Sequence, residues 1–518
     1  MANQQTPDYA QGEAAAIARD LSTQEWVPFI DWSQTHPGNR GVNRQGRYEL
    51  YDAPIGVRIR VEQAAKSEPA LTSNDRWEGG GNMVPLRVWR DGDTYKMLYA
   101  AYAHRSEDKN PGLGGGHHLC YAESADGYQW QRPELGQVEW QGSRANNIIA
   151  NPPTGTPFED PRGTPEERFK AIGQVGASFD PDTGEELDTV EAYNRWRRQE
   201  YEGDAYTGPR AESRHWVEGW TSPDGVRWTS VGRVGDMSSD GGSAAQYDEE
   251  TGGYYAYIRV GGMGRRATGL TRTDEFWHWP PASLVLAPDP QDDPDLSFYG
   301  CSYFRYPGNP DLHCAFVETY HQVGDYNDAQ IAFSRDMTHW FRPDRSPVIP
   351  CGEPGSPDSG GARPWGGLIE LPDGYWATMY RGHVGLHNYR ASDPEIPHRP
   401  GVLQLARWLP HRFCGVEAEM EGRFTIPTVK RSRDALRLNY RCAPGGHIQA
   451  ELIRTVPSRI HPDADPIPGF SFADCDLLSG DNLDRPVSWR GSTDLSAAGD
   501  EIAVRLKLFQ AKVFAYSA

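Results

Sequence analysis

Three carboxylate residues in the first half of the chain stand beside residues that favour unusual or rigid backbone. Glu78 precedes three glycines, Asp160 precedes a proline, and Asp240 precedes two glycines. Hydrolysis of a glycosidic bond needs one carboxyl group that donates a proton to the leaving oxygen and a second that acts as nucleophile or base. Crowded carboxylates can supply both, because each shifts the pKa of its neighbour. Glu78, Asp160 and Asp240 are therefore our candidate catalytic residues.

A second set of residues offers what recognition of a sugar requires, namely flat apolar faces, acceptors and bidentate donors. These candidate substrate-binding residues are Trp77, Tyr299, Glu318, Asp358, Arg363, His383 and His387. The two histidines lie in a glycine-bearing loop and not on a helix, so they predict hydrogen bonds to substrate in preference to a metal site. No metal or cofactor is predicted, since the sequence has no calcium-binding loop that would support a calcium ion.

A degenerate repeat indicates the elements that would position these residues. An apolar strand is followed by Ser or Thr, an Asp-containing turn and an aromatic residue in copies at residues 119–130, 219–228, 269–277 and 331–340. A fifth copy, at residues 402–408, has lost the turn residues. The Asp-Gly pairs in the first two copies are hairpin signals, so we interpret these Asp residues as turn formers. Five such units predict a five-bladed β-propeller, whose inner strands converge on a central funnel.

The composition and the later sequence predict an all-β chain with three parts. The chain has 56 Gly, 41 Pro and 17 Trp against 8 Met, as expected for many short strands joined by turns. We assign residues 1–65 to an N-terminal extension whose strands pack on the other domains, 66–418 to the propeller, and 419–518 to a β-sandwich. The last part contains alternating stretches at 422–427, 436–440, 447–452 and 502–508.

Charge and the N-terminal residues limit the partners and the compartment. The formal net charge is −20 and the isoelectric point about 5.2, which argues against nucleic acid or an anionic membrane as partner. The first six residues have no basic or apolar signal segment, and no stretch is long and apolar enough to span a membrane. We expect a soluble cytoplasmic protein with a carbohydrate partner, and the sequence leaves homo-oligomerisation open.

The pattern resembles the five-bladed propeller glycoside hydrolases, most closely proteins similar to families 32 and 43. In family 32 an Asp-Pro motif on the second blade supplies the transition-state stabiliser, and the resemblance implies that role for Asp160. The family's first-blade Asn-Asp-Pro-Asn motif and its Glu-Cys motif are replaced here by residues 77–80 and 239–241. Activity on fructosides is therefore not implied.

Three functions are compatible with these residues. The first is a glycoside hydrolase that cleaves a small glycoside, an oligosaccharide or a polysaccharide end. The second is a glycoside phosphorylase or transglycosidase, in which a basic clamp of Arg363, Arg381, His383 and His387 binds phosphate. The third is a non-catalytic carbohydrate-binding propeller, which would bind sugar without turnover.

Overall fold

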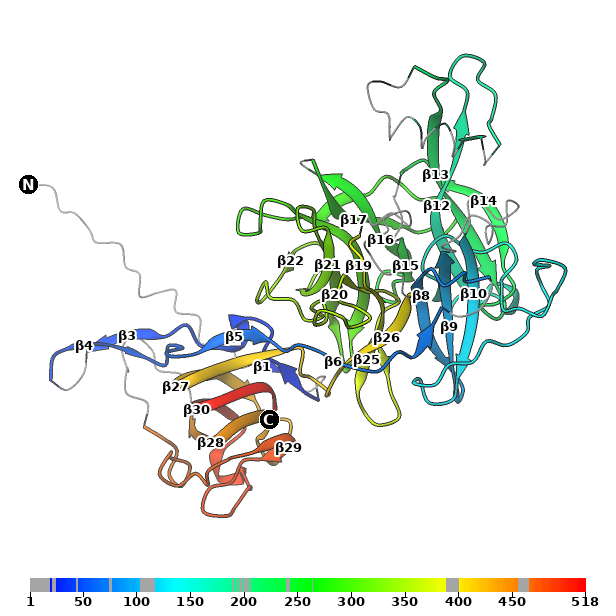
Figure 1. Ribbon diagram of the computed structural model, residues 1–518. Coiled ribbons are helices and arrows are strands. Elements are labelled where there is room, and N and C mark those ends of the chain that lie inside the picture. The colour runs from blue at the N-terminus through cyan, green and yellow to red at the C-terminus, as the bar shows by residue number, and fades with distance from the viewer. Residues whose placement is uncertain are drawn as a thin grey trace, which may run out of the picture. The chain divides into compact units, whose positions relative to one another are not determined.

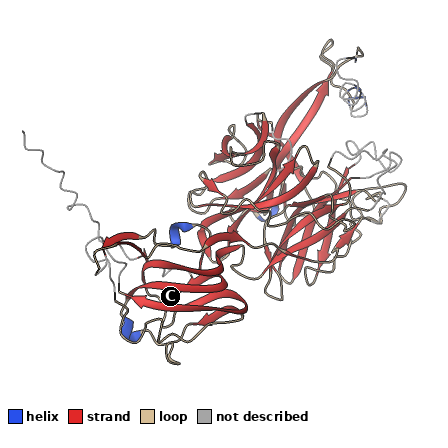
Figure 2. Cartoon of the chain, turned by 60° about the vertical axis from the view of Figure 1, so that its left-hand side comes forward, coloured by secondary structure: helices blue, strands red, loops and turns tan. Residues whose placement is uncertain are grey.

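The structure is a computed structural model of the 518-residue chain. It describes residues 19–20, 25–42, 45–73, 77–102, 117–188, 191–192, 195, 198, 205, 207–238, 243–262, 264–387, 400–454 and 465–518. The chain forms two compact units, one comprising Met1–Glu62, Pro307–Pro310 and Leu409–Ala518, and the other Gln63–Tyr306 and Asp311–Trp408. In this division the N-terminal segment belongs to the same unit as the C-terminal segment. Figure 2 shows that strands and loops make up almost all of the described residues in both units.

The larger unit consists of antiparallel sheets that follow one another along the chain. The first sheet consists of β8 (Asn82–Asp91), β9 (Thr94–Tyr102) and β10 (His117–Ser124). The second consists of β11 (Phe158–Glu159), β12 (Phe169–Phe179), β13 (Glu212–Ser222) and β14 (Thr229–Gly235). The third consists of β15 (Ala244–Tyr247), β16 (Tyr254–Gly262), β17 (Arg265–Thr273) and β18 (Ser283–Leu286). The short 3-10 helix η5 (Pro165–Glu167) lies between β11 and β12.

A ten-stranded sheet completes this unit. It comprises β19 (Leu296–Tyr306), β20 (Asn309–His321), β21 (Tyr326–Ser334), β22 (Trp340–Phe341), β23 (Gly361–Pro364), β24 (Ile369–Glu370), β25 (Trp376–His383), β26 (Val402–Trp408), β6 (Ala65–Lys66) and β7 (Leu71–Thr72). One parallel pair, Asn327 with Gly361, joins its two groups of strands. Because a single pair decides whether this sheet counts as one blade or two, the number of five blades stays a prediction.

The sheets close into a ring. The second sheet contacts the third through β11, β12 and β15, the third contacts β19, and β25 and β26 contact β8. Figure 1 shows the yellow strands β25 and β26 beside the blue β8. In addition, β6 and β7 precede the first sheet in sequence but pair with β26, which ties the two ends of the ring together. The all-β propeller fold predicted from the sequence is confirmed.

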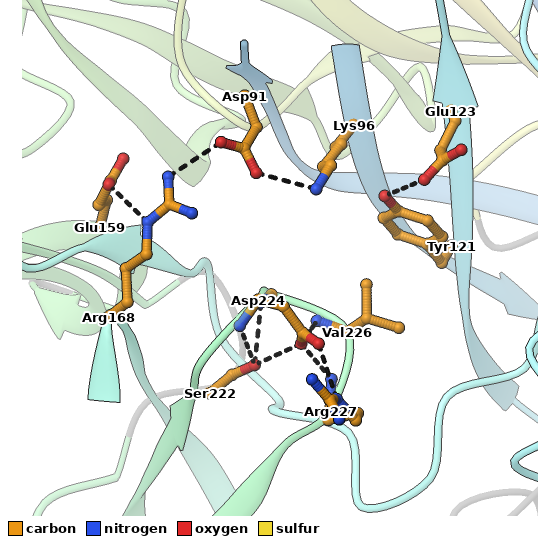
Figure 3. A network of polar contacts seen from close by, with 11 residues as sticks. Asp91, Lys96, Tyr121, Glu123, Glu159, Arg168, Ser222, Asp224, Val226 and Arg227 are labelled. Atoms are coloured by element: carbon orange, nitrogen blue, oxygen red, sulfur yellow. Dashed lines mark hydrogen bonds and ion pairs between the residues drawn. The ribbon is translucent and has the colours of Figure 1, made fainter. Parts of the chain in front are cut away.

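The repeated Ser-x-Asp motif forms a capped turn, as predicted. In the second sheet Asp224 Oδ1 accepts hydrogen bonds from the backbone N–H groups of Val226 and Arg227 at 2.9 and 2.8 Å (Figure 3). Ser222 Oγ accepts a hydrogen bond from the Gly225 N–H at 2.9 Å. The motif fixes its own backbone and its Asp is engaged there, so its recurrence reflects structure.

These turns define the two ends of the ring. The turn end carries the motifs that follow β10, β13 and β21, and β8 and β11 also finish there. Arg168 joins the first two sheets at this end, with 3.0 Å to Asp91 and 2.8 Å to Glu159, and Asp91 also pairs with Lys96 (Figure 3). At the opposite end, here called the far end, β9, β16, β20 and β25 finish and β10, β17, β21 and β26 begin.

The smaller unit is built on one seven-stranded sheet. Its strands are β1 (Arg19–Asp20), β2 (Val27–Pro28), β5 (Arg58–Val61), β27 (Cys414–Lys430), β28 (Arg437–Ile453), β29 (Asp481–Pro486) and β30 (Glu501–Ser517), and β3 (Asn39–Val42) and β4 (Tyr48–Tyr51) form a separate hairpin. Two further 3-10 helices are η2 (Trp32–Gln34) and η7 (Ser496–Ala498). The predicted alternating stretches lie in β27, β28 and β30 or directly beside them, and their apolar residues form one buried core with Phe470 and Trp489.

A buried ion-pair cluster in the larger unit predicts a pH-dependent stability. Asp292 pairs with Arg342 and Arg345, each at 2.6 Å. Burial raises the pKa of Asp292, but hydrogen bonds from Arg342, a backbone N–H and Arg345 outweigh it and lower the pKa from 3.8 to about 2. Since the folded-state pKa is the lower one, this stabilisation is present above about pH 4 and is lost as the pH falls toward 2.

We expect Asp292→Asn to lower the free energy of unfolding by about 3 kcal/mol at pH 7, because buried Arg342 loses its close ion pair and keeps only the longer one to Asp289 at 3.4 Å. Urea unfolding at pH 7 and at pH 3 measures this difference, which should shrink at the lower pH. The exposed neighbour Asp293 provides the control variant Asp293→Asn, which should unfold like the wild type. Equal stability of Asp292→Asn and wild type at pH 7 would disprove the role given to this cluster.

Candidate active site

A buried carboxylate lies near the far end of the ring. Glu318, on β20, has no exposed surface. Its Oε1 forms an ion pair with Arg363 Nε and accepts a hydrogen bond from Asn327 Nδ2 at 3.3 Å, and its Oε2 accepts one from Arg363 Nη2 at 3.3 Å. Gly300 on β19 makes room for this group, since a Cβ there would lie 3.2 Å from Glu318 Oε2. Side chains from two strands, β21 and β23, therefore fix the carboxylate.

Two arginines stand directly opposite each other beside this carboxylate. Arg363 on β23 is the register partner of Arg381 on β25. Directly opposed residues in an antiparallel pair have their side chains on the same face, with Cβ atoms about 4.5–5.5 Å apart. His383, two positions after Arg381, lies on the same face, and its own register partner is Gly361. A Cβ at Gly361 would lie 2.1 Å from His383 Cε1, so the glycine leaves space for the imidazole.

An aromatic cluster faces the arginines. The guanidinium carbons of Arg259, Arg266 and Arg363 lie 4.4, 4.6 and 5.1 Å from the centre of the Tyr299 ring. The Tyr299 hydroxyl is 2.9 Å from His387 Nε2, and the two rings are 4.8 Å apart. Tyr299 is therefore the point at which the third sheet and both strand groups of the ten-stranded sheet meet.

Burial and positive charge determine the protonation of the histidines. Burial lowers the pKa of His387 to about 3, and the charges of Arg363 and Arg381 add to this effect. Burial, Arg381 and Arg363 also hold the pKa of His383 well below its usual range. Both imidazoles are thus neutral near pH 7. Burial and Arg363 lower the pKa of Arg381 to about 9, which leaves its guanidinium charged at the same pH.

Five of the ten predicted site residues come together in this cluster. They are Tyr299, Glu318, Arg363, His383 and His387. Arg259 and Arg266 were not predicted from the sequence, whereas Arg381 was named as part of the predicted phosphate clamp. A charged residue directly after the buried apolar stretch Tyr254–Ile258 was the available signal for Arg259.

Glu78 and Trp77 are engaged within the first sheet. Glu78 is fully buried and accepts hydrogen bonds from Arg132 on both oxygens, at 2.9 and 2.8 Å, and from the Tyr99 hydroxyl at 2.6 Å. Trp77 donates its indole N–H to Asn147 Oδ1 at 2.7 Å. A bidentate arginine pair of this kind holds Glu78 in one orientation. The geometry favours a structural role for both residues.

Asp160 lies at the turn end, whereas Glu318 lies near the far end. It follows β11, and its Oδ2 pairs with Lys170 at 2.7 Å and accepts a hydrogen bond from the Tyr254 hydroxyl at 2.8 Å. Its Oδ1 accepts from the Arg162 N–H at 2.9 Å. Lys170 and Tyr254 begin strands that rise from the turn end, so these contacts fasten the second sheet to the third.

The two remaining predicted carboxylates differ in what the structure describes. Asp358 pairs with Lys66 at 2.5 Å and accepts a hydrogen bond from the Tyr380 hydroxyl at 3.0 Å. Tyr380 and Arg381 are adjacent on β25 and point to opposite faces, so Asp358 lies on the other face of the strand from Arg381. Asp240 lies outside the described residues.

Two negative findings concern the described residues only. Within the described ranges no group of three or more His, Cys, Asp and Glu side chains is arranged to hold a metal ion. No helix in the same part of the chain has the length and apolar character to cross a membrane.

Comparison with known proteins returns solved structures only, since no family model and no curated protein matches. The chain is similar to a thermostable family-43 glycoside hydrolase, with 11% identity and a TM-score of 0.39, over 63% of this chain and 88% of that one. It is similar to the catalytic domain of a GH62 alpha-L-arabinofuranosidase from Coprinopsis cinerea, with 11% identity and a TM-score of 0.40, over 67% of this chain and 97% of that one. It is also similar to the GH32 beta-fructofuranosidase of Bombyx mori, with 9% identity and a TM-score of 0.39, over 88% of this chain and 93% of that one.

The predicted resemblance to glycoside hydrolases of families 32 and 43 is found again among these structures. At these identities and TM-scores the likeness carries no argument about the reaction. The reaction is therefore argued from the side chains at the far end.

The contacts of Asp160 predict a loss of stability on substitution. Lys170 is only 5% exposed, and Asp160→Asn would leave its ammonium group with only the distant carboxylate of Glu167, at 4.0 Å, as counter-ion. We expect the free energy of unfolding to fall by about 3 kcal/mol, measured by urea denaturation. The control Glu159→Gln breaks a more exposed pair with Arg168 and should cost less than about 1 kcal/mol. A fully stable Asp160→Asn protein that has lost turnover would instead support the catalytic role predicted from the sequence.

Proposed function

We propose that this protein is a glycoside hydrolase whose reaction takes place at the far end of the propeller, with Glu318 as a reacting carboxyl group. The observation that carries the proposal is the position of Glu318. It is fully buried, Arg363 and Asn327 fix its orientation, and Arg363 also lies over the Tyr299 ring, with 5.1 Å from the guanidinium carbon to the ring centre. Carboxylates held in this way at the centre of a ring of strands provide the charge that an oxocarbenium-like transition state requires.

The surrounding side chains have complementary roles in the proposal. Tyr299 offers a hydroxyl and a ring, and neutral His387 holds that hydroxyl at 2.9 Å. Arg363 orients Glu318 and carries hydrogen-bond donors suited to sugar hydroxyls. As the ion-pair partner of Arg363, Glu318 fits the role of base, nucleophile or stabiliser of positive charge. Asp240, four positions before the first residue of β15, is our proposal for the second carboxyl group.

Substitution of Glu318 tests this proposal. Wild type and Glu318→Gln would be assayed against a panel of aryl glycosides, furanosides included. We expect wild type to release the aryl group from at least one substrate, and Glu318→Gln to lose about 10²- to 10⁴-fold in kcat, as for removal of a general acid or base. The exposed residue Glu353 supplies the control Glu353→Gln, which should retain full activity. Undiminished turnover by a folded Glu318→Gln protein would refute the assignment.

A glycoside phosphorylase is the second candidate, favoured by one observation. The four residues of the predicted phosphate clamp, Arg363, Arg381, His383 and His387, lie in the same cluster as Glu318. In an inverting phosphorylase, phosphate attacks in place of the water that a general-base carboxylate would activate, so a single carboxyl group, the general acid, would suffice. Release of the aryl group only when phosphate is added would select this function. Sugar binding without turnover, under either condition, would select the carbohydrate-binding propeller.

A further inference from the structure

Arg381 is a buried cation for which the described residues provide no hydrogen-bond acceptor. Arg381 is 7% exposed, and its Nε has no hydrogen-bond partner among the described residues. Arg363, directly opposite, is paired with Glu318, so one carboxylate faces two guanidinium groups. Like charges opposed across two strands destabilise the sheet, and an uncompensated buried charge destabilises the fold. An anion at this position would remove both costs.

His383 adds a neutral donor to the same face. The residue is 6% exposed, and neither ring nitrogen has a hydrogen-bond partner among the described residues. A neutral imidazole carries one N–H donor and one acceptor, and a buried pair of unused nitrogens is costly unless a ligand engages it. His387 Nδ1 is likewise buried without a partner. Unused polar atoms of Arg381, His383 and His387 therefore belong to the same cluster as Arg363.

We propose that Arg381, Arg363 and His383 form a binding site for an oxyanion, either the carboxylate of a uronic acid residue in the substrate or inorganic phosphate. The planar fork of a guanidinium group matches both anions bidentately, and charge-assisted hydrogen bonds of this kind are about twice as strong as neutral ones. Arg259 and Arg266, near the same Tyr299 ring, increase the positive charge around the site. The inference rests on the proposed function in one respect, namely that the oxyanion belongs to the substrate or co-substrate of that reaction.

The competing explanation is that Arg381 only supports the fold. Glu318 is close enough to raise the pKa of Arg381, so some compensation exists without a ligand. If that compensation were sufficient, replacing Arg381 would destabilise the ligand-free protein. If the site instead awaits an anion, an apolar replacement of similar length should leave the ligand-free protein as stable as the wild type or more stable, as found when buried charges are replaced by apolar residues.

The experiment is a binding titration of the full chain by calorimetry, with melting temperature as a second readout. The ligands are inorganic phosphate, glucuronate, galacturonate and, as the neutral control, glucose, all at one ionic strength set with chloride. The proteins are wild type, Arg381→Met and Arg272→Met, the last removing an exposed arginine toward the turn end of β17. We expect wild type and Arg272→Met to bind an oxyanion and to show a higher melting temperature in its presence. Arg381→Met should bind the oxyanion at least tenfold more weakly, and its melting temperature should not rise.

The outcomes distinguish the two sources of the anion, and they test the oxyanion site separately from the proposed reaction. Binding of phosphate alone supports the site and the phosphorylase; binding of a uronate alone supports the site and a hydrolase of acidic sugars. No binding of any oxyanion by wild type, or equal binding by Arg381→Met, would overturn the inference. Glu318→Gln should still bind the oxyanion, more tightly because a negative neighbour is gone. An inactive wild type that nevertheless binds it would count against the proposed reaction and not against the site.

Discussion

The repulsion between two buried guanidinium groups, held opposite each other by the register of β23 and β25, is the constraint on which the far end of the propeller depends. Arg363 and Arg381 cannot separate, because the backbone hydrogen bonds of the two strands fix their Cα positions. Glu318 balances one of them and stands at ion-pair distance from Arg363. The orientation of the carboxylate and the proposed affinity for an anion follow from this excess of positive charge. Burial is the larger cause of the lowered pKa values that keep His383 and His387 neutral, and the positive charge adds to it.

The fold provides this constraint by bringing strands of different sheets to one place. Glu318 comes from β20, Tyr299 from β19 and the arginine pair from β23 and β25, while Arg259 and Arg266 come from the third sheet. The ring keeps its geometry through contacts at the opposite end, where Asp160 pairs with Lys170 and Arg168 bridges Asp91 and Glu159. Stabilising ion pairs at the turn end are therefore separated from the strained charges near the far end, so the latter can serve binding.

Local patterns in the sequence were sufficient to predict the fold, but they did not reveal at which end of a blade a residue lies. The Asp224 turn is encoded within six residues, 222–227, and could be predicted because every one of its hydrogen bonds is local. Asp160 was predicted to be catalytic from its Asp-Pro pair. Such a pair beside a strand does not reveal at which end of the blade it lies, and Asp160 lies at the turn end. Glu78 was chosen for its glycines, yet its environment is set by Arg132, 54 residues later. Tyr299, Arg363 and His383 were predicted because a ring, a bidentate donor and ring nitrogens suit a sugar, and these properties can be read from the residue type alone.

A double-mutant cycle on Arg363 and Arg381 tests the central claim most directly. The free energy of unfolding would be measured by urea denaturation for wild type, Arg363→Met, Arg381→Met and the double variant, without added oxyanion and with it. The account predicts a repulsive coupling energy of about 1 kcal/mol or more between the two residues without the anion, and its loss when the anion is present. A coupling near zero in both conditions, or an attractive one without the anion, would contradict the account.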